Sequence, residues 1–446
     1  MNVSCWYECS RGRESRAPFT GVIYRCRGCD GLLDVAYDLD SLKKRSAAEW
    51  KALFANRVAS GEWPYTSGVW SKYEWVCPLV EKENIVSLGE GNTPLLPVTR
   101  LGEQFGVADL WIKQSATSHT GSFKDLGMTV LVSAVNQMIK EGRPIRAVAC
   151  ASTGDTSAAL AAYCAVAGIP AIVFLPRGKA STAQLALPIA HGALVLALDT
   201  DFDGCMRIVQ HVTADGSIYL ANSMNSLCIE GQKTVAIELV QQLNWSVPDW
   251  IIIPSVNLGN VTALGRGFLM MKELDLIDRL PRIACAQAEN VNPLYRSYQS
   301  WFAHYEPITA EETLASAIQI GNPVSVERAV KILCAFDGVV EQASEEELAH
   351  IAPVADRVGF YCCPQTGVAL AALSKLRERG QIGSSERVIV ISTGHGLKFT
   401  GFKVGYHEQI LDDAKPRPAN AAVELPADPD VVFDWIVETL DKGNNR

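Results

Sequence analysis

The sequence predicts an α/β protein with two three-layer domains, each built on a mostly parallel sheet, together with an N-terminal extension. Between residues 110 and 400, short β-branched runs alternate with Gly- or Ser-rich turns and Ala/Leu-rich helical stretches. The runs are apolar throughout, which is typical of strands whose two faces are both covered by helices. The clearest runs lie at residues 147–150, 171–175, 194–198, 251–253, 283–286 and 388–391.

The composition argues against nucleic-acid-binding, membrane and exported proteins. Of the 446 residues, 48% are hydrophobic and 20% are charged, and the net charge is −9. Because basic residues are scattered, we do not expect a nucleic-acid surface. The sequence has no apolar run of about 18 residues and no signal-peptide pattern, so we expect neither a membrane protein nor an exported one. The 13 cysteines are spread along the chain, several of them in apolar runs. We therefore expect reduced thiols and a cytoplasmic protein.

These patterns also suggest a division of the chain. The expected parts are an N-terminal extension over residues 1–100, a first domain over 101–245, a second domain over 246–413, and a linker with a terminal helix over 414–446. Within the extension, residues 25–38 favour a small strand-and-turn unit and residues 41–58 favour a helix. The aromatic segment over residues 63–75 is interpreted as packing that covers a domain or forms a dimer contact.

Ligands of parallel sheets bind where a strand ends and the turn leads into a helix, so these turns are the candidate sites. The first turn, residues 118–125, precedes a predicted helix over residues 126–140. Ser122 and Asp125 have capping-box spacing, which places Lys124 near the helix N-terminus. The helix dipole there disfavours an ammonium ion, and forming an imine with an aldehyde requires a neutral amine. The alternative is a solvated surface lysine.

Two further turns offer hydroxyl and backbone N–H groups to an anion. Residues 151–157 lie between a strand and a predicted helix over residues 158–167, and they suit one carboxylate or one phosphate. Ordinary N-capping is the alternative. Residues 254–260 form a second candidate phosphate cradle, although Asn and Gly suit any tight turn. A fourth turn, residues 392–398, contains His395, for which a structural role is the more common one.

In order along the chain, these and neighbouring segments resemble the plant-type threonine synthases. These enzymes belong to the fold-type II pyridoxal-phosphate family, which is related to the tryptophan synthase β-subunit. The resemblance extends from about Tyr24 to Phe402. It rests on WPYTSGVWSK (63–72), GEGNTPL (89–95), SHTGSFKDLGMTVLVS (118–133), ASTGDTSAALAAYCAVAGIP (151–170), NSMNSLCIEGQKT (222–234), ASAIQIGNPVS (315–325), CPQTGVAL (363–370) and STGHGLKF (392–399).

The resemblance implies a role for each candidate residue. Lys124 would form the Schiff base with pyridoxal 5'-phosphate and then act as a mobile acid and base. Thr393 would bond the pyridine nitrogen, and Asp155 would face the 3-hydroxyl. The cofactor phosphate would be held by Ser255, Val256, Asn257, Leu258, Gly259 and Asn260. The substrate carboxylate would be held by Ser152, Thr153 and Thr156, with Asn222 and Ser223 near the substrate phosphate.

The implied reaction converts O-phospho-L-homoserine and water into L-threonine and phosphate. The resemblance further implies a homodimer and, for some members, activation by S-adenosylmethionine, for which we assign no residues. Three positions depart from the family pattern: Cys228 replaces an arginine, the pair Ser255-Val256 replaces two glycines, and Gln365 replaces a histidine. Losing an arginine at a phosphate typically costs about 1.5–3 kcal/mol per hydrogen bond. The departure at residue 228 motivates an alternative, a cysteate synthase or another β- or γ-replacement enzyme acting on O-phosphoserine.

A rival from another class is a cofactor-free regulatory protein with this fold; Lys124, Thr393 and residues 257–260 argue against it. Separately, Cys5-x3-Cys9 and Cys26-x2-Cys29 offer a four-thiolate zinc knuckle. The loose first spacing and the basic residues after it favour a metal-free remnant. We therefore assign no metal ligand from the sequence.

Overall fold

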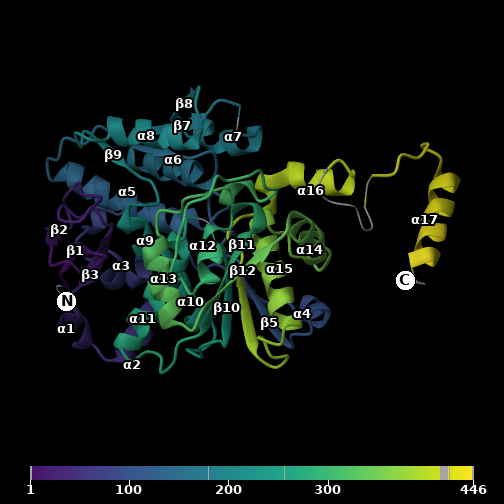
Figure 1. Cartoon of the computed structure of the whole chain (residues 1–446), viewed down its shortest axis with the longest axis horizontal. Coiled ribbons are helices and arrows are strands. Elements are labelled where there is room, and N and C mark those ends of the chain that lie inside the picture. Colours follow the sequence, from purple (N-terminus) through teal and green to yellow (C-terminus); the bar gives the residue numbers. More distant parts are fainter. Residues whose placement is uncertain (1–2, 179, 256, 412–419, 421, 444–446) are drawn as a thin grey trace.

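The protein is a mixed α/β structure in which two mostly parallel sheets carry the core, as the sequence predicts (Figure 1). The structure is a computed structural model that describes residues 3–443, except residues 179, 256, 412–419 and 421. A small antiparallel sheet near the N-terminus, in the order β2-β1-β3, packs beside them. Its strands are β1 (Cys5–Cys9), β2 (Arg16–Pro18) and β3 (Leu33–Tyr37).

One sheet has four parallel strands in the order β8-β7-β6-β9. These strands are β6 (Ala147–Ala151), β7 (Ala171–Pro176), β8 (Leu194–Leu198) and β9 (Ile218–Leu220). The helices that pack around this sheet or continue from its strands are α5 (Lys124–Lys140), α6 (Asp155–Ala167), α7 (Thr182–Ala190) and α8 (Phe202–Val212).

The other sheet has six strands in the order β12-β11-β10-β13-β5-β4, and β4 at its edge is antiparallel. The strands are β4 (Leu95–Pro97), β5 (Asp109–Lys113), β10 (Trp250–Pro254), β11 (Arg282–Ala288), β12 (Val339–Ala343) and β13 (Arg387–Ile391). The helices of this half are α4 (Thr99–Phe105), α10 (Thr234–Gln242), α11 (Gly259–Glu273), α12 (Pro293–Tyr298), α13 (Val326–Ala335), α14 (Glu345–Arg357), α15 (Pro364–Glu378) and α16 (Thr400–His407). Helix α9 (Ser226–Gln232) packs against α5.

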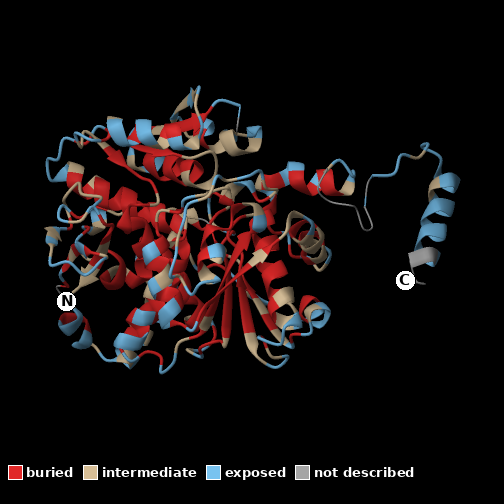
Figure 2. Cartoon of the chain, viewed as in Figure 1, coloured by how far each residue is buried: buried red, intermediate tan, exposed pale blue. Residues whose placement is uncertain are grey.

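The central strand β10 of the six-stranded sheet is apolar throughout, and all five of its residues are buried (Figure 2). In β10, Ile251 and Ile253 belong to the cluster that includes α11, whereas Trp250 and Ile252 belong to the cluster that includes α15. All four side chains are at most 3% exposed. The six apolar runs predicted from the sequence are all strands of the parallel sheets, so that prediction is confirmed.

Strand β5 crosses the expected boundary between the two domains. The sequence grouped residues 101–245 together, but β5 pairs with β13 in parallel and with β4 in antiparallel orientation, within the sheet of the second half. The four-stranded sheet begins only with β6. An apolar run identifies a strand but not its neighbour, because strand pairing depends on long-range contacts that leave no local periodicity.

The N-terminal extension packs on α5 through its aromatic side chains. Trp70 and Trp75 are fully buried, and the Trp70 indole N–H donates to Thr129 Oγ1 of α5 at 2.8 Å. The helix predicted over residues 41–58 is divided into two, because Ser46 and Glu49 form a capping box that starts the second helix. The helical segments here are α1 (Leu39–Lys43), α2 (Ala47–Ser60), η1 (Trp70–Lys72), α3 (Tyr73–Val76) and η2 (Lys82–Asn84).

The remaining segments are short 3-10 turns and a terminal helix. They are η3 (Glu289–Val291), η4 (Ser316–Ile318), η5 (Gly396–Phe399) and α17 (Pro429–Gly443), the last being the predicted terminal helix. Helix α17 lies apart from the body of the protein in Figure 1. Among the described residues, no helix combines the length and the apolar character needed to cross a membrane.

A buried ion pair ties the six-stranded sheet to α10. Lys113 at the end of β5 is fully buried and its ammonium pairs with the Glu238 carboxylate, whose side chain is 6% exposed. The ammonium also donates to Thr93 O at 2.6 Å and to Gln242 Oε1 at 2.8 Å. The ammonium, the carboxylate, the carbonyl and the amide thus satisfy one another's charges and hydrogen bonds away from water.

We expect Glu238→Ala to lower the apparent free energy of unfolding by about 3–5 kcal/mol, because it leaves a buried ammonium without its counter-charge. Urea unfolding followed by tryptophan fluorescence measures the change. Glu273→Ala is the matched control, since its pair with Lys43 is about half exposed and should contribute little. Equal effects of the two substitutions would contradict this account of the buried pair.

Candidate active site

The turn before α5 is held against the end of β13 by backbone hydrogen bonds. Ser122 and Gly394 form an antiparallel bridge. The Phe123 N–H donates to Thr393 O at 3.0 Å, and the His395 N–H donates to Gly121 O at 3.0 Å. Two of the four turns chosen from the sequence therefore lie side by side.

Lys124 is the first residue of α5, but the predicted capping box is wrong. The helix is capped at Phe123 without a side-chain hydrogen bond, and Ser122 Oγ accepts from the Lys124 N–H at 3.1 Å. The Asp125 carboxylate turns back to Thr120, accepting from its N–H at 2.7 Å and from its hydroxyl at 2.5 Å. Asp125 is fully buried, so its charge stabilises the preceding turn and not the free end of the helix.

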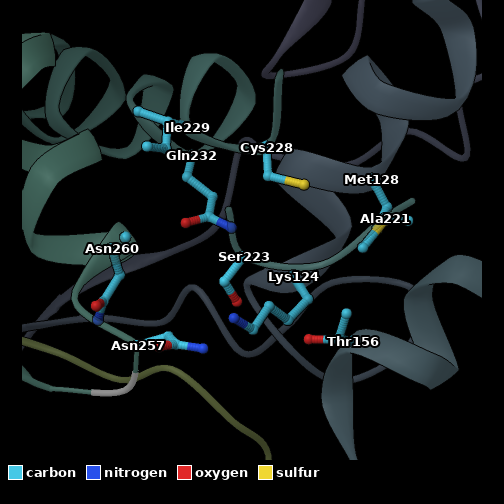
Figure 3. A pocket seen from close by; sticks show the side chains of 11 residues that line it. Lys124, Met128, Thr156, Ala221, Ser223, Cys228, Ile229, Gln232, Asn257 and Asn260 are labelled. Carbon is cyan, nitrogen blue, oxygen red and sulfur yellow. The ribbon is translucent and has the colours of Figure 1, made fainter. Parts of the chain in front are cut away.

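A cavity opens in front of the Lys124 amine (Figure 3). In this view the side chains of Lys124, Ser223 and Asn257 converge on its middle, while the Cys228 sulfur is directed toward Met128. The lining residues come from the starts of α5, α6 and α11 and from the segment that includes α9. They are Lys124, Met128, Thr156, Ala221, Ser223, Cys228, Ile229, Gln232, Asn257, Gly259 and Asn260.

The electrostatic environment favours a neutral amine. Burial lowers the pKa of Lys124 below its ordinary value, and the Asp155 carboxylate and the Cys228 thiol act in the opposite direction. Lys124 is thus not the solvated surface lysine that the sequence left open. The direction agrees with the sequence argument, but the main physical cause is loss of solvation and not the helix dipole.

Asp155 is fixed by an ion pair from the fourth turn. Lys398 Nζ lies 2.5 Å from Asp155 Oδ1, and both side chains are about nine-tenths buried. The same ammonium donates to Thr120 O at 3.2 Å. This contact links the start of α6 to the turns before α5 and after β13. The sequence had grouped Lys398 with its turn without assigning a partner.

The start of α11 is the candidate anion-binding cradle. Leu258 caps the helix in the left-handed region at φ +61°, and Gly259 and Asn260 begin it. A Cβ atom added at Gly259 would meet only Ser325 Oγ, at 4.0 Å, so the backbone is open on that side. The first N–H groups of a helix have no partner within it, and they favour a negative group.

Side chains of the same loop hold its shape. Asn257 Oδ1 accepts from the Val324 N–H at 2.7 Å, and Asn260 Nδ2 donates to Pro254 O at 2.8 Å. The Ser255 N–H donates to Ala286 O at 2.7 Å, which continues the β10–β11 pairing into the loop. Val256, the remaining residue of the predicted cradle, lies outside the described residues.

The predicted substrate residues divide into two groups. Thr156 and Ser223 line the cavity, whereas Ser152 and Thr153 lie in the turn between β6 and α6, where the Ser152 hydroxyl accepts from the Gly154 N–H at 3.2 Å. Asn222 uses its amide elsewhere. Its Oδ1 accepts from the Ala151 N–H at 3.0 Å, and its Nδ2 donates to Ala151 O at 2.9 Å. It thus joins the ends of β6 and β9.

These groups fit the cofactor that the resemblance implies. Pyridoxal phosphate requires an amine for imine formation, a cradle for its phosphate and a partner for its ring nitrogen. Lys124 and the start of α11 supply the first two in one cavity. Thr393 is buried, and among the described residues its hydroxyl makes only a long contact, 3.9 Å, with Cys363 Sγ. That hydroxyl is therefore free to serve the third requirement.

Comparison with known proteins gives the family. The model of the pyridoxal-phosphate dependent enzymes matches residues 86–394. Chloroplastic threonine synthase 2 of Arabidopsis thaliana is 54% identical over 427 residues, which are 95% of this chain and 82% of the relative. The threonine synthase of Methanocaldococcus jannaschii is 37% identical and covers 84% of this chain and 89% of its own. The crystal structure of threonine synthase from Escherichia coli superposes with a TM-score of 0.66 at 19% identity, covering 98% of this chain and all of that one.

The chain belongs to the threonine synthase family. It is thus a pyridoxal-phosphate dependent enzyme, and the cofactor-free regulatory protein is excluded. The expectation of a cytoplasmic protein is contradicted, because the Arabidopsis threonine synthase is chloroplastic and points to a plastid. That expectation rested on buried thiols, which exclude an oxidising compartment but do not distinguish between two reducing ones.

Because the chain belongs to the threonine synthase family, its departures from the family pattern at residues 228 and 365 need a structural description. Cys228 is a buried neutral thiol, since burial raises its pKa to about 12. Gln365 is buried at the start of α15. His395 has a structural role, because its Nδ1 accepts from the Leu397 N–H at 3.2 Å and caps η5.

The sequence analysis did not predict two of the residues that line the cavity, although their spacing along a helix indicates them. Met128 follows Lys124 by four residues, and Gln232 follows Cys228 by four. Residues four apart lie on the same face of a helix, so a helical projection from each candidate would have found both. Ala221 and Ile229 are apolar residues that no local pattern distinguishes from the core.

In this protein prepared without its cofactor, we expect the Lys124 amine to be acylated at lower pH than an exposed lysine, because burial depresses its pKa. Competitive labelling over a pH series, read by mass spectrometry, compares Lys124 with Lys140. In Asp155→Asn the Lys124 profile should move to still lower pH, since a carboxylate that favours the ammonium form is lost. Coincident profiles for Lys124 and Lys140 would refute the depressed pKa.

Proposed function

We propose that this protein converts O-phospho-L-homoserine and water into L-threonine and inorganic phosphate, with pyridoxal 5'-phosphate attached to Lys124. The single observation that carries the proposal is the position of a partly buried amine and of the open N-terminus of α11 in one cavity. The relatives named threonine synthase, which align with most of the chain, supply the reaction. The alternative substrate, O-phosphoserine, rests only on the departure at Cys228 and is not favoured by the relatives.

The chain's own groups have distinct tasks in binding the cofactor. When bound, pyridoxal phosphate withdraws the electrons that are left when a proton leaves carbon. The α11 start, from Ser255 to Asn260, holds its phosphate. Thr393 would bond its ring nitrogen, and a hydroxyl at that place would leave the nitrogen largely unprotonated. Asp155, positioned by Lys398, faces its 3-hydroxyl.

The substrate is bound by helix ends and by hydroxyl groups. Thr156 at the start of α6, with Ser152 and Thr153 in the turn before it, binds the α-carboxylate. Ser223 contacts the phosphate of the substrate. Asn222 positions Ser223 by fixing the end of β9 to β6 through Ala151.

Proton transfer is the task of Lys124. The reaction requires loss of a proton from Cα and then from Cβ, departure of phosphate from Cγ, return of a proton to Cγ, addition of water at Cβ and return of a proton to Cα. A neutral Nζ accepts the proton from Cα, and the lowered pKa makes that form accessible. Met128 and Ile229 supply apolar walls that limit the approach of bulk water.

Assembly and regulation follow the resemblance to plant-type enzymes. A homodimer is expected, and size-exclusion chromatography with light scattering reports it. S-adenosylmethionine is the candidate effector, to which no described residue is assigned. A change of turnover on its addition would establish that role.

We expect phosphate release from O-phospho-L-homoserine, with L-threonine as the amine product, and little release from O-phospho-L-serine. Lys124→Ala should lower kcat by about 10³-fold or more, because the attachment point and the proton carrier are both lost. Reduction with borohydride and peptide mass spectrometry should place the cofactor on Lys124. Lys140→Ala on the exposed end of α5 is the control. Turnover of phosphoserine alone would reject the proposed substrate.

We expect Cys228→Arg to leave kcat/KM for phosphohomoserine unchanged or lower. At this position α5 and α9 are in close contact: a Cβ at Gly127 would lie 2.8 Å from Cys228 O, so the surrounding backbone leaves little freedom. A second cation beside Lys124 would also disturb the amine. Cys228→Ala separates loss of the thiol from gain of charge. A gain of about tenfold or more with Arg would mean that the chain has lost a phosphate contact it once used.

A further inference from the structure

Three cysteines of the N-terminal extension form a cluster remote from the Lys124 cavity. The Sγ atoms of Cys9, Cys26 and Cys29 all lie within 4.8 Å of one another, and Cys9 and Cys29 are 3.4 Å apart. Cys9 and Cys26 are buried and Cys29 is partly exposed. Cys5 lies four residues earlier on β1, which is about 13 Å along a strand. The four-thiolate knuckle considered from the sequence is therefore wrong, because Cys5 does not belong to the cluster.

The cluster is built from two similar turns that face one another. In the first, the Gly12 N–H donates to Cys9 O at 2.9 Å. In the second, the N–H groups of Cys29 and Asp30 both donate to Cys26 O, at 3.4 and 2.8 Å. The second turn offers a thiol at each end, whereas the first offers Cys9 and then Gly12. A Cβ added at Gly12 would meet no atom within 4 Å, so the space beside that residue is open.

The surroundings of the cluster are polar and basic. Ser15 Oγ lies 3.7 Å from Cys26 Sγ. Arg11 donates to Cys29 O at 3.1 Å, and Arg13 donates to Gly28 O. Arg11 is itself held by Glu327 of α13. These basic residues, which in the sequence argued against a metal, lie where they would offset a surplus of thiolate charge.

We propose that Cys9, Cys26 and Cys29 bind one Zn²⁺ through three thiolates, with a water molecule at the fourth position on the Gly12 side. Soft sulfur ligands in tetrahedral arrangement select zinc among the common divalent ions. Each thiol that is protonated releases its proton as it binds, and no electron is transferred. Three thiolates and one dication leave a net charge of −1, which the neighbouring guanidinium groups of Arg11 and Arg13 offset.

The zinc site would fasten the small sheet to the enzyme core. The turn at Cys29 leads directly into β3, where Leu33 O accepts from Ser226 Oγ of α9 and from Arg328 of α13. Lys331 of α13 donates to Ser10 O, beside Cys9. The cluster thus lies where strands β1 and β3 meet two helices of the core.

Zinc content of the full chain with its cofactor tests the proposal. Protein purified without chelator should contain about one zinc per chain by mass spectrometry of the metal. Cys26→Ser and Cys29→Ser should each reduce that content about tenfold or more. Cys334→Ser, at an exposed cysteine on α13, is the matched control and should retain zinc. The cofactor absorbance at unchanged intensity shows that each variant is folded.

Substitution with cobalt reports the ligands themselves. Co²⁺ in a tetrahedral thiolate site gives intense visible bands at longer wavelength than the cofactor absorbs. These bands should appear in the unmodified chain and in Cys334→Ser, and should be lost in Cys26→Ser. Protein without zinc that also fails to bind Co²⁺, or a Cys9–Cys29 disulfide found in freshly purified chain, would overturn the proposal. Equal zinc in Cys26→Ser and the unmodified chain would do so as well.

Discussion

The backbone pairing between the turn before α5 and the end of β13 is the constraint on which the site depends. Its hydrogen bonds join Gly121 to His395 and Phe123 to Thr393, segments from opposite ends of the core. The pairing fixes both the first residue of α5 and the position of the Thr393 hydroxyl. Asp125, bound to Thr120, and Lys398, bound to Asp155 and to Thr120 O, hold the same junction from its two sides. Movement of either segment would change the position of the Lys124 amine relative to the Thr393 hydroxyl.

Three helix N-termini converge on the cavity, and they explain which ligands it suits. Lys124 begins α5, Thr156 lies in the first turn of α6, and Gly259 begins α11. Each helix start presents the positive end of a dipole. The first N–H groups of α6 and α11 have no partner within their helices, whereas those of α5 donate to Ser122 and Phe123. A cofactor phosphate, a substrate carboxylate and a substrate phosphate are all anions. Burial lowers the pKa of Lys124, so a neutral amine becomes accessible beside helix ends that suit anions.

The N-terminal extension contacts helices that line the Lys124 cavity. Asp34 of β3 forms ion pairs with Arg328 of α13 at 3.1 Å and with Arg266 of α11 at 3.5 Å. The Tyr37 hydroxyl donates to Glu230 of α9 at 2.5 Å. Helices α9 and α11 both contribute to the cavity lining. Buried charges of this kind contribute little net stability but strongly penalise other arrangements, so the small sheet constrains the orientation of these helices.

The sequence by itself determined the elements and the chemical type of the site. The six apolar runs are strands of the parallel sheets, because burial on both faces leaves a local signature, and polar turns after three of them mark candidate ligand sites. Only the tertiary structure decided the partners: β5 joins β13, Asp125 turns to Thr120, Asn222 binds Ala151, and Cys5 lies away from the other cysteines. The physical reason is the distance along the chain over which each interaction acts. Periodicity and capping preferences act over a few residues, whereas strand pairing, desolvation of Lys124 and the meeting of thiols depend on segments brought together by the whole fold.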